Sequence, residues 1–208
     1  MPNPPQPHLT MKSILFASLA GAIALATVNA KEVGKAAPAF AAKNLKGETV
    51  SLADHAGKVV VLEWANFSCP FVKKHYQGGN MPKLQADYAA KGVVWLTINS
   101  GAEGKQGYHE PSKMAEVAAA HKNQATHFIM DTDGTVGKAY DAKVTPHLFI
   151  INADGVLAYN GAIDSKATTN SADVETADKY FVKALDAVLA GNEVENATNK
   201  PYGCGVKY

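Results

Sequence analysis

Short runs of apolar and β-branched residues alternate with segments of helical character along most of this chain. Five such runs predict strands: Val59–Leu62, Val93–Ile98, His127–Met130, Leu148–Ile151 and Val156–Tyr159. Val93–Ile98 is continuously apolar, as the strands of a parallel sheet buried on both faces are. The segment Asn152–Gly155 between the last two runs predicts a hairpin turn.

Helices are predicted between these strands and after them. The expected helices are Pro70–Ala90 with a break at Gly78-Gly79 and a restart at Pro82, Pro111–His121, Val136–Ala142, and Val174–Ala190. The last carries its apolar residues on one face at helical spacing. Strands that alternate with helices, then a hairpin and a closing helix, predict an α/β fold with a mixed central sheet flanked by helices. A small N-terminal β-hairpin is expected within Ala39–Leu52.

The first 30 residues predict a targeting segment. Met11-Lys12 precedes an apolar stretch, Ile14–Val28, which ends in a small-residue cleavage pattern at Ala30. About fifteen apolar residues are too few to span a membrane comfortably, since a membrane helix needs about twenty. We therefore expect a cleaved secretory signal and a periplasmic or secreted chain, with an N-terminal membrane anchor as the alternative. Residues 31–191 then form one domain, followed by a tail, residues 192–208.

Composition narrows the function classes. The 208 residues carry a formal net charge of +1, which gives no electrostatic basis for binding nucleic acid or an anionic membrane. Two cysteines are too few for a disulfide framework. The chain has no glycine-rich dinucleotide fingerprint, so no dissociable cofactor is expected.

Cys69 is the first candidate for chemistry. It lies between the strand Val59–Leu62 and Pro70, which is tolerated at the first position of a helix. A helix N-terminus carries about half a positive charge and unpaired N–H groups, and both favour a thiolate over a thiol. This predicts a redox-active cysteine, with a buried structural cysteine as the alternative.

Cys204 lies in the tail between two glycines. A mobile tail predicts a thiol that approaches Cys69 and resolves its oxidised form. A permanent Cys69–Cys204 bridge is the second hypothesis, because closing so long a loop stabilises a fold by about 5 kcal/mol in the chain-entropy model. A free cysteine, or one that pairs with another chain, is the third.

Four further side chains bear on the site. Cys69, His75 and His147 are weak candidates for a copper or zinc site, although a lone histidine is more often a polar surface group. Trp64 is expected in the core or as a wall of the thiol pocket. Lys74 is expected on a solvated face of the helix that follows Cys69.

Several motifs in a fixed order resemble one family. They are A-P-x-F at Ala37–Phe40, G-K-V-V-V-L-x-W at Gly57–Trp64, Cys69-Pro70, Thr145-Pro146, and a hairpin followed by a helix. Together they resemble the thioredoxin-fold redoxins of the alkyl hydroperoxide reductase/thiol-specific antioxidant type, over residues 31–191. The resemblance implies that Pro146 is a cis-proline facing the thiol, and that the Thr145 backbone is presented to an extended peptide or disulfide substrate.

Departures from the family pattern are equally informative. Peroxiredoxins carry P-x-x-x-T/S-x-x-C, whereas Leu62 and Asn66 hold the proline and hydroxyl positions here. Thioredoxins carry C-x-x-C, whereas the second thiol is replaced by Val72. N-x-x-C-P-F-V-K and the tail P-Y-G-C-G-V-K-Y are similar to a peroxiredoxin-like subgroup that lacks both motifs.

Two functional hypotheses follow. In the first, the chain is a thiol oxidoreductase whose Cys69 thiolate attacks a small hydroperoxide or a disulfide. A peroxide would convert Cys69 to a sulfenic acid, which Cys204 condenses to a disulfide, and a thiol protein would be the electron donor or the substrate. In the second, the chain is a non-catalytic thioredoxin-fold module that binds a partner or a metal and has a structural Cys69–Cys204 disulfide.

Overall fold

The computed structural model describes residues 1–2 and 32–208. The predicted signal segment, Met11–Ala30, therefore lies outside the described residues. Within the described residues, no helix has the length and apolar character needed to cross a membrane.

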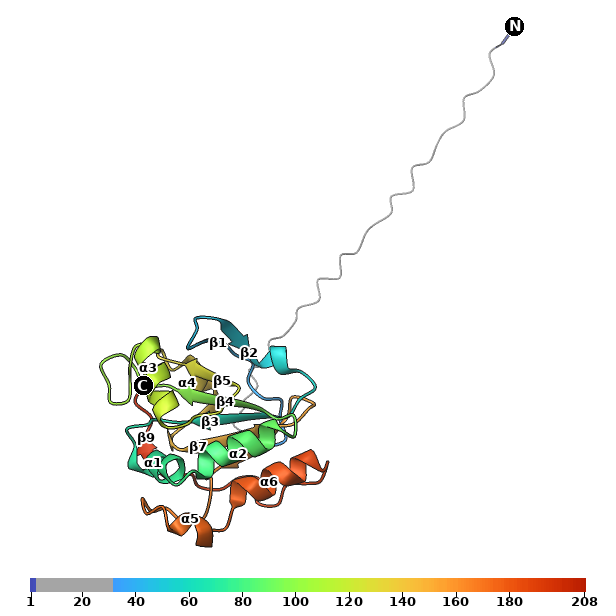
Figure 1. The fold of residues 1–208 in the computed structure, drawn as a ribbon. Coiled ribbons are helices and arrows are strands. Elements are labelled where there is room, and N and C mark those ends of the chain that lie inside the picture. The colour runs from blue at the N-terminus through green and yellow to red at the C-terminus, as the bar shows by residue number, and fades with distance from the viewer. Residues whose placement is uncertain (3–31) are drawn as a thin grey trace.

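A seven-stranded mixed sheet forms the centre of the described chain, with strand order β2-β1-β5-β4-β3-β7-β8 (Figure 1). The strands are β1 (Ala41–Asn44), β2 (Thr49–Ser51), β3 (Val60–Trp64), β4 (Val94–Asn99), β5 (His127–Met130), β7 (His147–Ile151) and β8 (Leu157–Gly161). Strands β3, β4 and β5 run parallel, and β7 pairs antiparallel with β3. The N-terminal hairpin β1–β2 joins the sheet through an antiparallel pairing with β5. This is the predicted mixed α/β sheet.

Helices cover both faces of this sheet. They are η1 (Leu52–His55), α1 (Pro70–Gln77), α2 (Asn80–Ala89), α3 (Pro111–Ala120), α4 (Thr135–Tyr140), α5 (Asp173–Thr176) and α6 (Tyr180–Leu189). One core cluster joins α1, α2, α3 and α6 to the sheet, and the other joins α4 and the N-terminal hairpin to the opposite face. Strand β3 serves both, because Val61 faces the first cluster and Leu62 the second, as strand alternation requires.

The predicted closing helix Val174–Ala190 is wrong in its first part. The chain forms the short helix α5, becomes extended at Ala177, and starts again as α6 at Tyr180. The break has a long-range cause. The Ser165 amide donates to the Asp178 carbonyl at 3.0 Å, and the Asp178 amide donates to the Ser165 hydroxyl at 2.9 Å. These two bonds replace helical hydrogen bonds, and they tie the segment to the loop that follows β8.

A second, two-stranded sheet lies at the end of β3 where α1 begins (Figure 1). It pairs β6 (Val144–Thr145) antiparallel with β9 (Cys204–Gly205) from the tail. The peptide bond between Thr145 and Pro146 is cis. The tail therefore reaches back across the domain to the segment that leads into β7.

Candidate active site

Cys69 lies at the junction that connects β3 to α1. Its backbone is extended, with φ −74° and ψ 125°, and its carbonyl accepts the first helical bond from Lys73 at 2.9 Å. Pro70 occupies the first turn of α1. The side chain is fully buried, at 0% exposure. In its thiol form it donates a hydrogen bond to the Thr145 carbonyl at 3.1 Å. The thiol thus joins the start of α1 to the cis-proline segment.

Cys204 approaches Cys69 from the tail. In the β6–β9 pairing it lies opposite Thr145, the residue whose carbonyl accepts the Cys69 thiol. Both cysteines are free thiols in the structure. Burial, a hydrogen bond to Cys69 and the charge of Cys69 raise the pKa of the Cys204 thiol to about 12. The Cys204 thiol therefore stays protonated at neutral pH.

Gly203 permits this close approach. Its φ is +139°, and a Cβ there would lie 2.0 Å from the Thr145 carbonyl oxygen. Only a residue without a side chain adopts this conformation against a neighbouring backbone at low cost. The glycine expected to make the tail mobile instead lets the tail dock.

The last three residues fix the tail beyond Cys204. The Val206 amide donates to the Lys143 carbonyl at 3.0 Å, and the Lys207 carbonyl accepts from the Ala102 amide at 2.8 Å. The terminal Tyr208 hydroxyl donates to the Ala142 carbonyl at 2.8 Å. These contacts hold the residues that follow β9.

Asn66, at the position where peroxiredoxins have a hydroxyl, supports the loop before the cysteine. Its amide nitrogen donates to the Gln106 carbonyl at 3.1 Å, and its amide oxygen accepts from the Ser68 amide at 2.8 Å. Both polar atoms are used in these bonds.

The buried hydroxyl of Thr145 has no hydrogen-bond partner in the fold. Among the described residues, the buried side-chain atoms without a hydrogen-bond partner are His55 Nε2 and Thr145 Oγ1. Burying an unpaired hydroxyl costs about 1–3 kcal/mol, and such groups in native structures call for a specific explanation. The same residue contacts Cys69 through its backbone carbonyl and pairs with Cys204, so this unpaired hydroxyl belongs to a residue of the cysteine site.

The two histidines proposed as weak metal ligands are occupied by protein partners. His147 Nε2 donates to Asn160 Oδ1 at 2.8 Å, and His75 uses Nδ1 with Asn80 at 3.0 Å and Nε2 with Tyr202 at 3.2 Å. Burial lowers the pKa of each imidazole to about 4. The described residues contain no group of three or more potential metal ligands. A copper or zinc site with Cys69 therefore does not fit this arrangement.

Trp64 lies in the core cluster on the sheet face opposite to the Cys69 cluster. Its indole packs edge-on against Phe149, with 5.1 Å between ring centroids, and donates to Ser100 Oγ at 2.9 Å. Side-chain alternation along β3 explains the placement, since Trp64 shares the face of Leu62. The prediction that Trp64 forms a wall of the thiol pocket is corrected to a packing role.

Glu63 is a buried carboxylate that the sequence predictions did not single out. It lies within β3 on the sheet face of the Cys69 cluster, and its exposure is 0%. Its oxygens accept four donors: Tyr76 Oη at 2.7 Å, Trp95 Nε1 at 2.8 Å, Gln85 Nε2 at 2.9 Å and Thr97 Oγ1 at 3.2 Å. The sequence did carry a signal for this site, since Glu63 is an acidic residue within an otherwise apolar strand.

Burial gives Glu63 a pH-dependent effect on stability. It raises the pKa of Glu63 above its ordinary value of 4.5. The folded state then keeps a proton that the unfolded state releases above about pH 4.5, so this group's contribution to stability falls as pH rises. We expect the free energy of unfolding of the wild type, measured relative to Glu63→Gln in urea, to fall by up to about 1.4 kcal/mol per pH unit. A constant difference between the two proteins from pH 4 to 8 would contradict this.

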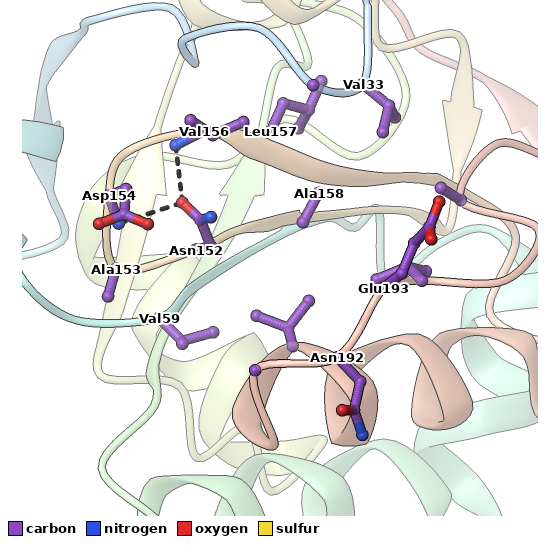
Figure 2. Close-up of a pocket in the computed structure, with 15 residues that line it drawn as sticks. Val33, Val59, Asn152, Ala153, Asp154, Val156, Leu157, Ala158, Asn192 and Glu193 are labelled. Atoms are coloured by element: carbon purple, nitrogen blue, oxygen red, sulfur yellow. Dashed lines mark hydrogen bonds between the residues drawn. The ribbon is translucent and has the colours of Figure 1, made fainter.

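A surface pocket of about 510 Å³ lies at the other end of the sheet (Figure 2). It is bordered by the β7–β8 turn and by Val59, which precedes β3, whereas Cys69 follows the opposite end of that strand. No residue of this pocket belongs to the cysteine site described above.

Comparisons with known proteins agree with this geometry. The model of the AhpC/TSA family matches residues 33–160. Among solved structures, an uncharacterized conserved protein from Geobacillus kaustophilus is 29% identical, with 86% of this chain and 93% of that chain covered and a TM-score of 0.73. A hypothetical protein from Sinorhizobium meliloti is 24% identical, with 85% and 94% covered and a TM-score of 0.71.

The thioredoxin domain of a thiol-disulfide oxidoreductase from Bacteroides vulgatus shares the fold, with 19% identity, 70% of this chain and 96% of that chain covered, and a TM-score of 0.51. The search of curated proteins gave no significant match. The family match covers more than half of the chain, and the sheet, the flanking helices and the structural neighbours have the thioredoxin-like architecture. The chain is therefore a thioredoxin-fold redoxin and belongs to the AhpC/TSA family.

Proposed function

We propose that this redoxin is a thiol-disulfide oxidoreductase in which Cys69 is the nucleophile and Cys204 the resolving thiol. The observation that carries this proposal is the placement of Cys204 opposite Thr145 and against Cys69, with the pKa of Cys204 raised to about 12. The raised pKa keeps the Cys204 thiol protonated near pH 7, which leaves Cys69 as the proposed nucleophile. Once Cys69 is oxidised it carries no charge, so its contribution to the high pKa of Cys204 disappears.

Disulfide exchange accounts for the most features of the site. The Cys69 thiolate attacks one sulfur of a substrate disulfide, so a mixed disulfide forms and the other sulfur leaves as a thiolate that takes up a proton. Cys204 then attacks Cys69, the Cys69–Cys204 bond forms, and the bound substrate leaves as a thiol. The substrate is reduced by two electrons. An external thiol protein then reduces the Cys69–Cys204 disulfide.

An extended substrate segment would use the position that the tail occupies. The β6 strand pairs through its backbone with β9, and strand addition to such an edge is a common way to bind an extended peptide. The tail itself thus supports the proposal that the partner presents its disulfide in an extended segment. A thiol or disulfide protein is accordingly the expected partner.

Hydroperoxide reduction is the second candidate, and the unpaired Thr145 hydroxyl favours it. The Cys69 thiolate would attack the terminal peroxide oxygen, the O–O bond would break, and the alcohol would leave after taking up a proton. Cys204 would condense with the sulfenic acid and release water. The Thr145 hydroxyl would then bind the peroxide.

The proposed setting is an oxidising compartment, where a disulfide persists. It is supported by the apolar segment and the small-residue pattern that end at Ala30. In this proposal residues 31–191 are the redoxin domain, and residues 192–208 carry the resolving thiol. A module with a permanent Cys69–Cys204 bridge is the non-catalytic alternative.

Single-turnover kinetics test the proposal. Reduced wild type, Cys69→Ser and Cys204→Ser are mixed in a stopped-flow instrument with an aromatic disulfide and, separately, with hydrogen peroxide. We expect the first oxidation step to slow by about a hundredfold or more in Cys69→Ser, because serine has no thiolate form at neutral pH, and to persist in Cys204→Ser. Equal rates in wild type and Cys69→Ser would refute the proposal. The faster of the two oxidants identifies the substrate class.

A further inference from the structure

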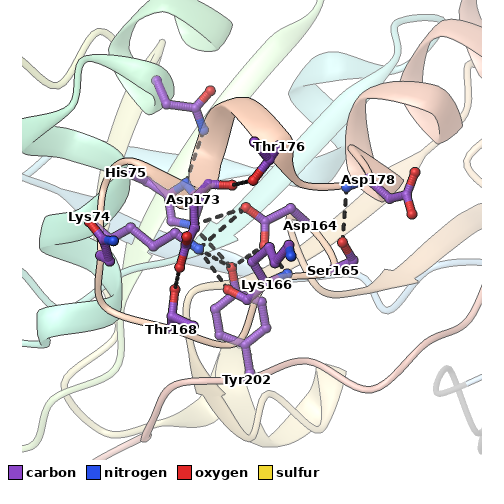
Figure 3. A network of polar contacts seen from close by, with 12 residues as sticks. Lys74, His75, Asp164, Ser165, Lys166, Thr168, Asp173, Thr176, Asp178 and Tyr202 are labelled. Atoms are coloured by element: carbon purple, nitrogen blue, oxygen red, sulfur yellow. Dashed lines mark hydrogen bonds and ion pairs between the residues drawn. The ribbon is translucent and has the colours of Figure 1, made fainter.

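Tyr202 precedes Cys204 by two positions, and its hydroxyl enters a buried polar cluster (Figure 3). The hydroxyl donates to Asp164 Oδ1 at 2.5 Å. It also lies 3.2 Å from His75 Nε2 and 3.4 Å from Lys74 Nζ. The tail is therefore fixed on both sides of its cysteine, by Tyr202 before it and by the β9 pairing after it.

The acceptor of the Tyr202 hydroxyl is one member of a buried ion pair. The side chains of Lys74 and Asp164 are 0% and 5% exposed, and Lys74 Nζ lies 3.6 Å from Asp164 Oδ2. Lys74 also donates to the Lys166 carbonyl at 2.6 Å. The expectation that Lys74 is solvated is therefore wrong, because Asp164 and the loop after β8 cover it. A hydrogen bond to a carboxylate is stronger than one between neutral groups.

The charge state of the cluster supports this donor role. Burial, followed by the contact with Asp164, raises the pKa of the Tyr202 hydroxyl, so it stays protonated. Burial also lowers the pKa of His75 to about 4, so the imidazole is neutral near pH 7. With His75 Nδ1 facing the Asn80 amide at 3.0 Å, Nε2 carries the proton and faces Tyr202. The ion pair in the cluster is the one between Lys74 and Asp164.

Three of the residues that contact Tyr202 belong to α1, the helix that follows Cys69. Phe71, Lys74 and His75 are spaced along one face of α1, and each contacts Tyr202. The Phe71 ring packs edge-on against the Tyr202 ring, with 5.8 Å between centroids. Tyr202 is thus attached to the rigid element that positions Cys69. Cys204 follows two residues later, so this attachment restricts where Cys204 can lie relative to Cys69.

We propose that Tyr202 is a positioning residue that raises the effective concentration of the Cys204 thiol at Cys69. That Tyr202 helps Cys204 to resolve an oxidised Cys69 during turnover rests on the proposed function. The effect of Tyr202 on the equilibrium between a Cys69–glutathione mixed disulfide and the Cys69–Cys204 disulfide does not. In that equilibrium Cys204 attacks a Cys69–glutathione mixed disulfide. The Cys69–Cys204 bond forms, the bond to glutathione breaks, and glutathione leaves with the proton. Tyr202 favours this product over the mixed disulfide because it holds Cys204 in the reacting position.

Redox titration tests this proposal. The purified chain, Tyr202→Phe and Tyr208→Phe are equilibrated in glutathione buffers, free thiols are trapped by alkylation, and the Cys69–Cys204 disulfide is quantified by intact mass. Tyr202→Phe removes one oxygen and keeps the ring that packs on Phe71. In this variant we expect the effective concentration of the Cys204 thiol at Cys69 to fall about tenfold or more. The midpoint potential of the Cys69–Cys204 disulfide then becomes about 30 mV less negative.

Tyr208→Phe is the matched control. It also removes a tail hydroxyl, but one that lies four residues after Cys204, donates to the Ala142 carbonyl and, among the described residues, contacts no residue of α1. The β6–β9 pairing remains in this variant, so we expect the midpoint to stay close to that of the wild type. Unfolding midpoints measured on the reduced proteins show that each variant folds.

The outcomes separate the two proposals. A normal midpoint in Tyr202→Phe, or equal shifts in both variants, would overturn the positioning role and leave the proposed function intact. Absence of a Cys69–Cys204 disulfide in the wild type under every buffer would overturn both.

Discussion

Replacing Gly203 with alanine is expected to release the tail from Cys69. The new Cβ would lie 2.0 Å from the Thr145 oxygen and 2.7 Å from its carbonyl carbon, at a φ of +139°. Both neighbours are backbone atoms, and the same oxygen accepts the Cys69 thiol at 3.1 Å, so neither has room to move. Strain of this kind costs about 1–3 kcal/mol or more per residue. Leaving the docked position relieves it.

Two measurements follow from this release. Alkylation of Cys69 in a Cys204→Ser background should be about ten to a hundred times faster with Gly203→Ala, since about 1.4 kcal/mol of lost docking energy exposes the thiol tenfold more often. The Cys69–Cys204 disulfide should also become easier to reduce. Gly205→Ala is the control, because a Cβ there meets only the Lys143 oxygen at 4.0 Å. Equal alkylation rates in the two variants would show that the tail does not protect Cys69.

Replacing Cys204 with serine is expected to stop turnover after the first oxidation of Cys69. Serine keeps the size of the side chain and the β9 backbone pairing opposite Thr145, but it cannot attack an oxidised sulfur at neutral pH. With a disulfide substrate, the mixed disulfide on Cys69 should therefore persist. With peroxide, the sulfenic acid should proceed to the irreversible sulfinic form.

Steady-state turnover with an external dithiol shows the size of this effect. We expect a loss of about a hundredfold in Cys204→Ser, because the intramolecular thiol acts at a high effective concentration that a free reductant does not reach. Intact mass after one equivalent of oxidant gives the state of Cys69. Normal turnover, with no adduct and no oxygen retained on Cys69, would show that Cys204 has no resolving role.

Local signals predicted most of the scaffold. The sequence correctly predicted β3 from the apolar run before Trp64, and the start of α1 from the proline after Cys69. Adjacent residues largely decide whether a strand is buried and where a helix begins. The hairpin β7–β8 was likewise predicted from its turn residues. Each of these features depends on a few consecutive side chains.

Features that depend on distant partners were not predicted. The break before Tyr180 requires Ser165 to bond with Asp178, and neither residue differs in character from those of a continuous helix and its preceding loop. Lys74 was expected in solvent because its partner, Asp164, lies far along the chain. The relation of Cys69 to Cys204 stayed open for the same reason, since the path of the tail is decided by contacts of Tyr202 and Gly203 with other elements.

The most direct test of the account is the connectivity of the two cysteines after mild oxidation. The reduced chain is treated with one equivalent of an aromatic disulfide or hydrogen peroxide, free thiols are alkylated, and proteolytic peptides are mapped by mass spectrometry without reduction. We expect one intramolecular pair of linked peptides, containing Cys69 and Cys204, that separates on adding a dithiol. Recovery of the two cysteines in separate alkylated peptides, or a link that dithiol does not break in the folded chain, would contradict a resolving Cys204.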